Sequence, residues 1–237
     1  MILGVLKRSD PSVLLNLEFN GSNGSQVFSD SSPYGRVMSV LAGSPALSTT
    51  SPLSGASSLL LGVGGSIKTP DFTTPAATYI KTIEFRIKAD LATIASGESQ
   101  GVFVKGYSNS SFQYYSHQCL ITRNASGNGG KVRCYWYNAA VSQIAMYLEV
   151  TITDLSQNNH IAFTQRSNGI YAAYLNGVLS GTSGFVQNYE ANTLDFIIGA
   201  TVYDWALSVN TARFTGYLDN FRVSNIDSYP TAFTPPV

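Results

Sequence analysis

The sequence predicts an all-β protein, a two-sheet antiparallel β-sandwich of jelly-roll type. Composition is the first indication: of 237 residues, 12% are charged, 12% are aromatic and 21 are glycine, as in chains of many strands joined by tight turns. The second is the alternation of apolar and polar residues, which is clearest over Tyr79–Ala89, YIKTIEFRIKA. The third is Ile161–Gly181, where turns at 167–169 and at Asn176-Gly177 separate three short strands. We expect one sandwich domain over residues 13–226, an N-terminal arm over 1–12 and an extended tail over 227–237.

In the first half of the chain we expect strands and one long surface loop, taken here in chain order. Val13–Phe19 is the expected first strand and Tyr34–Leu41 the second. Ala42–Ser58, rich in Ser, Pro and Gly, is expected to be a surface loop. Leu59–Lys68 is expected to be one strand interrupted by glycines. In Tyr79–Ala89, the residues expected to face the core are Tyr79, Ile83, Phe85 and Ile87. The side expected to face water is made of Ile80, Thr82, Glu84, Arg86 and Lys88.

The second half supplies the remaining strands. Outside the central meander they are expected over Gly101–Lys105, Gln113–Thr122, Lys131–Asn138, Ala145–Ile152, Leu194–Gly199 and Phe214–Val223. The last of them is expected to pair in the sheet of the first strand, because a sandwich brings its terminal strands into the shared core. After it, Pro230, Pro235 and Pro236 prevent regular pairing and predict an extended tail.

Two cysteines, Cys119 and Cys134, lie symmetrically about the loop Arg123–Gly130. They should therefore face each other across a hairpin, where facing Cβ atoms are about 4.5–5.5 Å apart. A disulfide would need only a small adjustment from that distance. The preferred interpretation is two reduced, half-buried thiols, since no secretion signal precedes the domain. A metal site is not expected at the two cysteines, because no third or fourth metal-ligating residue lies at a suitable spacing from them.

Charge and hydropathy indicate which partners to expect. The formal net charge is +0 and no basic patch is visible, so binding to nucleic acid is not expected. No apolar run reaches the length of a membrane span, so no membrane partner is expected either. The first residues, MILGVLKRSDPS, place their basic pair after the apolar part, which favours a short arm over a signal peptide.

Five motifs occur in an order that resembles a known family. They are SIKTPD (Ser66–Asp71), TIEFRIK (Thr82–Lys88), HIAFTQRSNGIYAAYLNGVLSG (His160–Gly181), LDFIIGA (Leu194–Ala200) and FTGYLDNFRVSN (Phe214–Asn225). This succession resembles the concanavalin A-like, laminin G-like jelly-roll family. The segments Leu15–Ser32 and Tyr229–Val237 resemble a branch of that family found in tailed-bacteriophage virion proteins.

The resemblance implies a non-enzymatic structural protein of the virion. It would be a capsid decoration or cement protein bound to the outside of the shell, and a place on the capsid surface is favoured over one on the tail. Its partners would be the major capsid protein or other virion proteins, and its open sheet edges predict a homo-oligomer such as a trimer. The residues expected to attach it, and to become ordered only on binding the shell, are Met1, Ile2, Leu3, Val5, Leu6, Phe233, Pro235 and Pro236.

The alternative function is a carbohydrate-binding, lectin-like protein that recognises a host-surface glycan. Its aromatic platforms would be Tyr107, Tyr203 and Trp205, which the sequence places in loops. The same side chains are equally suited to a protein interface. The residues do not distinguish these two uses.

Enzymatic activity is not expected. Jelly-roll glycosidases use paired carboxylates, whereas Glu84 stands alone on its strand beside Arg86 and Lys88. The two histidines, His117 and His160, are interpreted as ordinary strand residues, and no G-x-S-x-G motif presents a serine.

Calcium is the one candidate cofactor, because members of the family hold this cation at the rim of the sandwich through carboxylates and carbonyls. The candidate ligands are Asn20, Asp30 and Asp219. For Asp219 the preferred interpretation is a hydrogen bond to the backbone of a turn.

Overall fold

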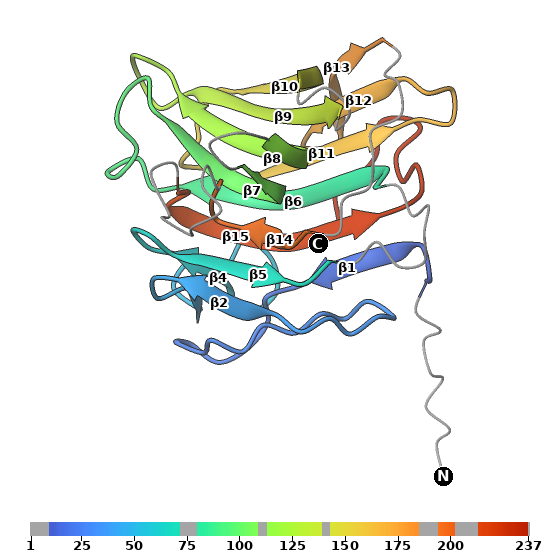
Figure 1. Cartoon of the computed structure of the whole chain (residues 1–237). Helices are drawn as coiled ribbons and strands as arrows, with labels where there is room; N and C mark the ends of the chain where they lie inside the picture. The colour runs from blue at the N-terminus through green and yellow to red at the C-terminus, as the bar shows by residue number, and fades with distance from the viewer. Residues whose placement is uncertain are drawn as a thin grey trace.

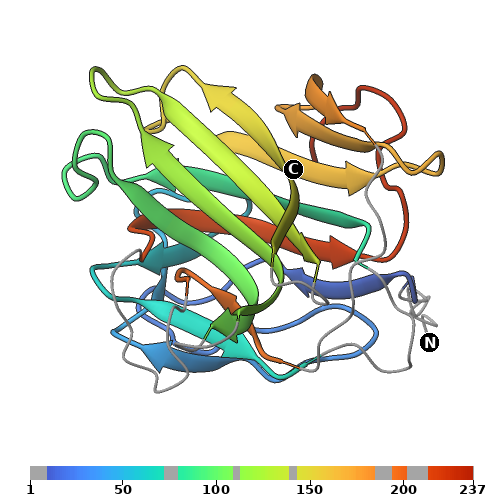
Figure 2. The same cartoon turned by 45° about the horizontal axis from the view of Figure 1, so that its top comes forward.

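The protein is a sandwich of two antiparallel sheets (Figures 1 and 2). The structure, a computed structural model, describes residues 10–71, 80–108, 113–138, 143–184, 194–201 and 213–236. In this part of the chain the first sheet has eight strands, in the order β13 (Val178–Ser183), β12 (Tyr171–Leu175), β11 (Asn159–Gln165), β6 (Thr82–Ala89), β15 (Gly216–Ser224), β4 (Ser58–Leu61) and β3 (Ala46–Ser48), with β1 (Val13–Leu17) paired to β15. The second sheet has the order β10 (Gln143–Ile152), β9 (Gly130–Asn138), β8 (Gln113–Arg123), β7 (Ser99–Ser108), β14 (Phe196–Ile198), β5 (Ser66–Thr69) and β2 (Ser39–Ala42). The predicted fold class is confirmed.

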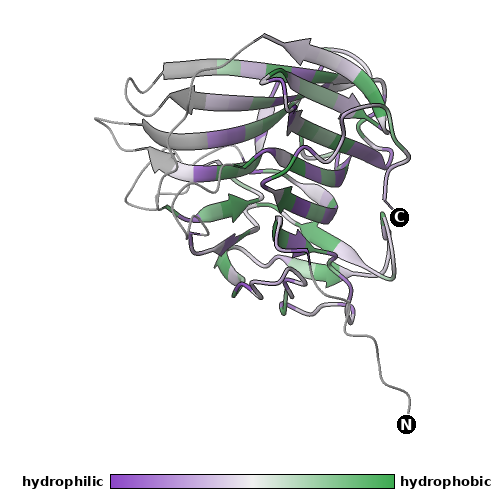
Figure 3. Ribbon diagram, turned by 90° about the vertical axis from the view of Figure 1, so that its right-hand side faces the viewer, coloured by the Kyte–Doolittle hydropathy of each residue, from purple (hydrophilic) through white to green (hydrophobic). Residues whose placement is uncertain are grey.

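The core between the sheets is centred on four phenylalanines. Phe221 of β15 stacks on Phe85 of β6 with ring centroids 5.5 Å apart. It meets Phe103 of the second sheet edge-on at 5.6 Å, and Phe196 at 5.7 Å. All four are fully buried. Hydrophobic and hydrophilic residues alternate along many strands (Figure 3), so the predicted period-two pattern is what creates this dry interior.

The central meander forms as predicted. Strands β11, β12 and β13 pair in succession, and the turn between the last two has positive φ at Asn176 (51°) and Gly177 (79°). Those two values match the turn whose twist suits a two-residue hairpin. The pairing of the last strand with the first is also confirmed, since Leu17 lies opposite Phe221.

The two cysteines face each other as the sequence predicts. Cys119 of β8 is the register partner of Cys134 of β9. Both thiols are buried and free in this structure. Burial raises the pKa of both thiols well above the ordinary value, which keeps them protonated and unreactive at neutral pH.

Three predicted elements in the first third of the chain differ from the structure. Leu59–Lys68 is two strands, β4 and β5, which belong to different sheets. The turn between them closes through a hydrogen bond from Gly65 N to Gly62 O of 2.9 Å, so the glycines reverse the chain across the sandwich. The expected surface loop Ala42–Ser58 contains the strand β3, and the second strand begins at Ser39 and not at Tyr34.

The side of β6 that was expected to face water is largely covered. Thr82 and Glu84 are only 1% and 2% exposed. Their cover is the C-terminal segment Asp227–Pro236, here called the strap, whose Tyr229 and Phe233 pack on a small apolar cluster of the first sheet's outer face. The cluster consists of Ala162, Ala172 and Tyr174. The red C-terminal segment can be followed beside β12 and β13 in Figure 2.

The strap is extended and unpaired, as its prolines predict, yet it is held at several points. The rings of Tyr229 and Phe233 stack with centroids 3.6 Å apart. Phe233 N donates a hydrogen bond of 3.0 Å to Gly177 O, and Tyr174 Oη donates one of 2.7 Å to Tyr229 O. A Cβ at Gly177 would lie 1.8 Å from Phe233 O, so only glycine permits this approach. These contacts hold the strap on its own domain, and its part in attachment to a capsid stays a prediction.

The described chain includes no helix with the length and apolarity needed to span a membrane.

Candidate functional site: a polar cleft on the first sheet

A cleft of about 600 Å³ lies on the outer face of the first sheet. One wall comes from β1 and the loops that follow it, and the other from β6, β11 and β15. Pro236 of the strap closes one end. The lining is mostly polar: Asp10, Val13, Asn16, Glu18, Asn20, Ser31, Ser32, Pro33, Ser54, Gly55, Glu84, His160, Asn220, Arg222 and Pro236. A concave site with convergent polar groups is the usual form of a small-ligand site.

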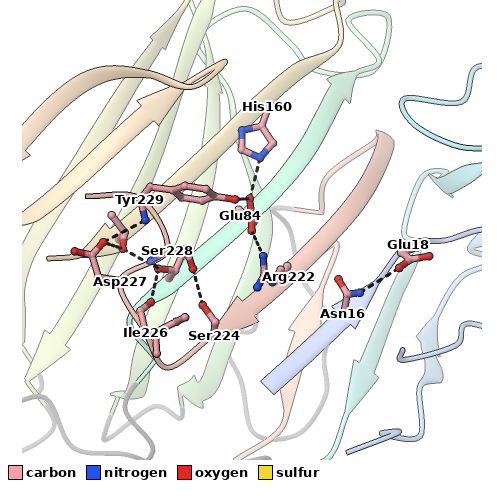
Figure 4. A network of polar contacts seen from close by, with 12 residues as sticks. Asn16, Glu18, Glu84, His160, Arg222, Ser224, Ile226, Asp227, Ser228 and Tyr229 are labelled. Atoms are coloured by element: carbon pink, nitrogen blue, oxygen red, sulfur yellow. Dashed lines mark hydrogen bonds and ion pairs between the residues drawn. The ribbon is translucent and has the colours of Figure 1, made fainter. Parts of the chain in front are cut away.

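Glu84 forms the floor of the cleft, and three side chains from different elements converge on its carboxylate (Figure 4). His160 Nε2 lies 3.1 Å from Oε2, and the hydroxyl of Tyr229 donates to the same oxygen. Arg222 Nη1 lies 3.4 Å from Oε1. Glu84 sits outward on β6 because its neighbours Ile83 and Phe85 point into the core, and the flanking strands β11 and β15 supply His160 and Arg222 on the same face.

The floor is an unusually buried polar network. Glu84 and His160 are 2% and 1% exposed. Burial, and then the neighbouring Glu84 carboxylate, raise the pKa of Tyr229 far above the ordinary range, so its hydroxyl remains a hydrogen-bond donor. His160 Nδ1 is buried and has no hydrogen-bond partner among the described residues. A buried polar atom without a partner costs free energy, which marks this floor as more than a packing element.

Beside the floor, in the same sheet, β1 and the segment after it present donors and acceptors, with Asn16 next to Arg222 in the ladder. On β1, Asn16 Nδ2 donates to Ser31 Oγ at 2.7 Å and to Glu18 Oε1 at 3.2 Å. Glu18 itself is exposed. Next to the lining residue Pro33, Tyr34 is 43% exposed and its hydroxyl donates to Pro11 O at 3.1 Å. This side of the cleft therefore combines amide, carboxylate and hydroxyl groups. The ring of Tyr34 lies beside it, with the guanidinium of Arg36 over one ring face, 5.0 Å from the centroid.

The three candidate calcium ligands lie around this cleft, but their oxygens accept hydrogen bonds from the chain. Asp30 accepts from the backbone N–H groups of Asn16, Ser32 and Arg36 at 2.8–2.9 Å. Asn20 Oδ1 accepts from Ala56 N at 3.0 Å. Within the described ranges no group of three or more His, Cys, Asp and Glu side chains could hold a metal ion. Calcium binding remains a prediction.

Asp219 holds the loop that forms the cleft's far wall. Its Oδ2 accepts from Ser54 N at 3.0 Å and from Ser58 Oγ at 2.7 Å, and its Oδ1 accepts from Asn220 N at 2.8 Å. This is the turn and backbone bonding that the sequence favoured for Asp219. Burial raises its pKa to about 6, against the opposing effect of these hydrogen bonds.

This shift predicts a pH dependence of stability. Because the carboxyl titrates near 6 when folded and near about 3.9 when unfolded, the folded state holds the proton more tightly. The stabilisation of the folded state by the proton on Asp219 is fully present below about pH 4 and is lost as the pH rises through about 6. We expect Asp219→Asn to remove this component, so the difference in melting temperature between variant and parent should change across pH 4–7. A constant difference over that range would show that Asp219 titrates normally.

The family of this chain is assigned by a family model that matches its sequence. Residues 61–228 match the model of the concanavalin A-like lectin/glucanases superfamily. The chain belongs to this superfamily. No curated protein is similar enough in sequence to count as a match.

Structures of toxin domains share the fold. The receptor-binding domain of botulinum neurotoxin C/D mosaic serotype aligns with a TM-score of 0.62 at 12% identity, covering 92% of this chain and 49% of that one. The serotype D binding domain gives 0.63 at 12%, with 92% and 49% covered. The type G receptor-binding domain gives 0.60 at 13%, with 93% and 49% covered. This chain thus spans about half the length of those structures, and the similarity is one of fold.

Of the other predicted site residues that the structure describes, Pro236 lines the cleft and Phe233 lies over its floor. Tyr107 lies in strand β7, opposite Tyr114, and not in a loop as expected. Phe233 lies over the floor, edge-on to His160 with centroids 5.7 Å apart. Pro235 and Pro236 follow it in the strap. Outside the described residues lie Tyr203, Trp205, Met1, Ile2, Leu3, Val5 and Leu6.

Sequence reasoning missed the floor of the site. The sequence shows no second carboxylate on the strand of Glu84, and it favours an ordinary strand role for His160. The sequence pattern could have shown that Glu84 and His160 lie on the same face of the sheet. Glu84 is the register partner of Ala162, and Ala162 and His160 are two residues apart on β11, so their side chains share a face. Nothing in local sequence indicated that Tyr229, 145 positions further along the chain, donates to Glu84.

Proposed function

We propose that this protein is a non-catalytic carbohydrate-binding module and that saccharide binds in the polar cleft. The observation that carries the proposal is the cleft itself, in which Asn16, Glu18 and Arg222 present hydrogen-bonding groups beside the buried carboxylate of Glu84. Sugar hydroxyl groups both donate and accept, and a wall of mixed amide, carboxylate and guanidinium groups satisfies both roles. Tyr34 beside the cleft offers an aromatic face for the apolar side of a sugar ring.

The geometry favours binding over hydrolysis. Glycoside hydrolysis needs an acid and a second carboxylate at a controlled separation across the scissile bond. Both oxygens of Glu84 are already engaged by His160, Tyr229 and Arg222. Glu18, beside the floor of the cleft, is bonded to Asn16. Engaged carboxylates of this kind orient a ligand and are poorly placed to transfer protons.

A place on a phage capsid stays a prediction from sequence resemblance. It includes attachment through Met1–Leu6 and assembly as a trimer. The docking of Phe233 on its own domain leaves the N-terminal segment as the better candidate for attachment. The two roles are compatible. A protein attached to a capsid through its N-terminal segment could still bind a host glycan in the cleft, because the cleft lies on the outer face of the first sheet.

A glycan array with the full chain tests the proposed function. We expect binding to at least one class of saccharide, weakened about tenfold or more by Glu18→Ala, because the loss of one hydrogen bond to a charged group changes the binding free energy by about 1.5–3 kcal/mol. The matched control is Thr151→Ala, an exposed residue of β10 on the other sheet, which should leave binding unchanged. Failure to bind any saccharide would contradict the proposal, as would equal binding by the Glu18 variant.

A further inference from the structure

The hydroxyl of Tyr229 occupies a site that is made of side chains from three strands. Glu84 accepts its hydrogen bond from the middle of the first sheet, with His160 on one side and Arg222 on the other. Glu84, His160 and Arg222 also line the cleft, together with Pro236 of the strap. The cleft therefore reaches Glu84, and the carboxylate of Glu84 is bonded to the hydroxyl of the chain's own tyrosine.

From this arrangement, which rests on the proposed function, we infer that Glu84, His160 and Arg222 form an inner hydroxyl-binding subsite of the saccharide cleft, with the strap as its intramolecular occupant. A sugar hydroxyl would replace the hydroxyl of Tyr229 as donor to Glu84. Saccharides long enough to reach from Asn16 to Glu84 would bind only when the strap withdraws.

The contacts of the strap suit an occupant that can leave. The described part of the strap forms no regular β pairing, and its polar contacts with the first sheet are separate hydrogen bonds spread along its length. Thr231, Ala232 and Thr234 between its anchors are exposed. Its main apolar anchor is the half-buried ring of Phe233, which covers His160 and Tyr174. Weakening that anchor should raise the fraction of molecules with an open subsite, and apparent affinity rises in proportion to that fraction.

The test compares the full chain with Phe233→Ala and with Thr231→Ala, an exposed strap residue that serves as the matched control. Hydrogen exchange at the amide of residue 233, which donates to Gly177 O, reports whether the strap is released. Saccharide affinity is measured on the same samples. We expect about tenfold tighter binding for Phe233→Ala, no change for Thr231→Ala, and a smaller gain when Glu84→Gln is added, because an amide oxygen accepts a weaker hydrogen bond than a carboxylate.

A synthetic peptide with the sequence of residues 229–236 provides a second readout. Added to the Phe233→Ala chain, it should bind and displace saccharide. Released strap with unchanged saccharide affinity would overturn the inner subsite while leaving the proposed function standing. Absence of saccharide binding by every variant would overturn the proposed function and this inference with it. Saccharide binding by the full chain that becomes tighter in the released variants would support both.

Discussion

Phe221→Ala should lower the free energy of unfolding by about 3–5 kcal/mol, the range for truncating a large aromatic side chain in a well-packed core. Phe221 is fully buried and contacts Phe85, Phe103 and Phe196. It therefore joins two strands of one sheet to two of the other. Its removal leaves a cavity between the sheets that the rigid strands cannot fill by collapse.

Chemical denaturation followed by circular dichroism measures this loss. The control is Val63→Ala at a position that is 84% exposed, where the change should stay within about 0.5 kcal/mol. Equal effects of the two substitutions would mean that Phe221 does not lie between the sheets, and the sandwich packing described above would be wrong.

Glu84→Ala should have the second largest effect, a loss of about 2–4 kcal/mol of stability. Removing one partner of a buried charged network leaves the others without their hydrogen bonds. Here those partners are His160, which is 1% exposed, and the hydroxyl of Tyr229. The guanidinium of Arg222 is 30% exposed and can turn to water, which keeps the expected loss below that of a fully buried ion pair.

The isosteric variant Glu84→Gln separates charge from packing. Its amide oxygen can still accept from Tyr229, so about half of the loss should be recovered. Thermal and chemical denaturation of both variants check the prediction. If Glu84→Ala were as stable as the parent, the carboxylate would have to be solvated in solution, and the floor of the cleft as described would not exist.

The sandwich itself could be predicted because its information is local. Alternation along Tyr79–Ala89 identified β6, and the turn at Asn176-Gly177 identified the meander. The symmetry of Cys119 and Cys134 about their loop gave the register of β8 and β9, which the structure reproduces. Each inference needed only a few adjacent residues and the period of a strand.

The parts that could not be predicted depend on contacts between distant residues. Alternation places Glu84 on the outer face of its sheet, but it does not say what covers that face. The cover is Tyr229 and Phe233, which local sequence describes only as part of a proline-rich tail. The separation of β4 and β5 into different sheets likewise depends on which strands they meet, and a glycine-rich turn is compatible with either outcome.

The measurement that tests the central claim most directly is the mapping of a bound saccharide by amide chemical shifts in nuclear magnetic resonance spectra. With a saccharide identified on the array, we predict that the largest changes fall on Asn16, Glu18 and Arg222, around the cleft of the first sheet. Changes confined to the second sheet, for example at Arg133 and Tyr147, with the cleft residues unaffected, would contradict the assignment of this cleft as the binding site.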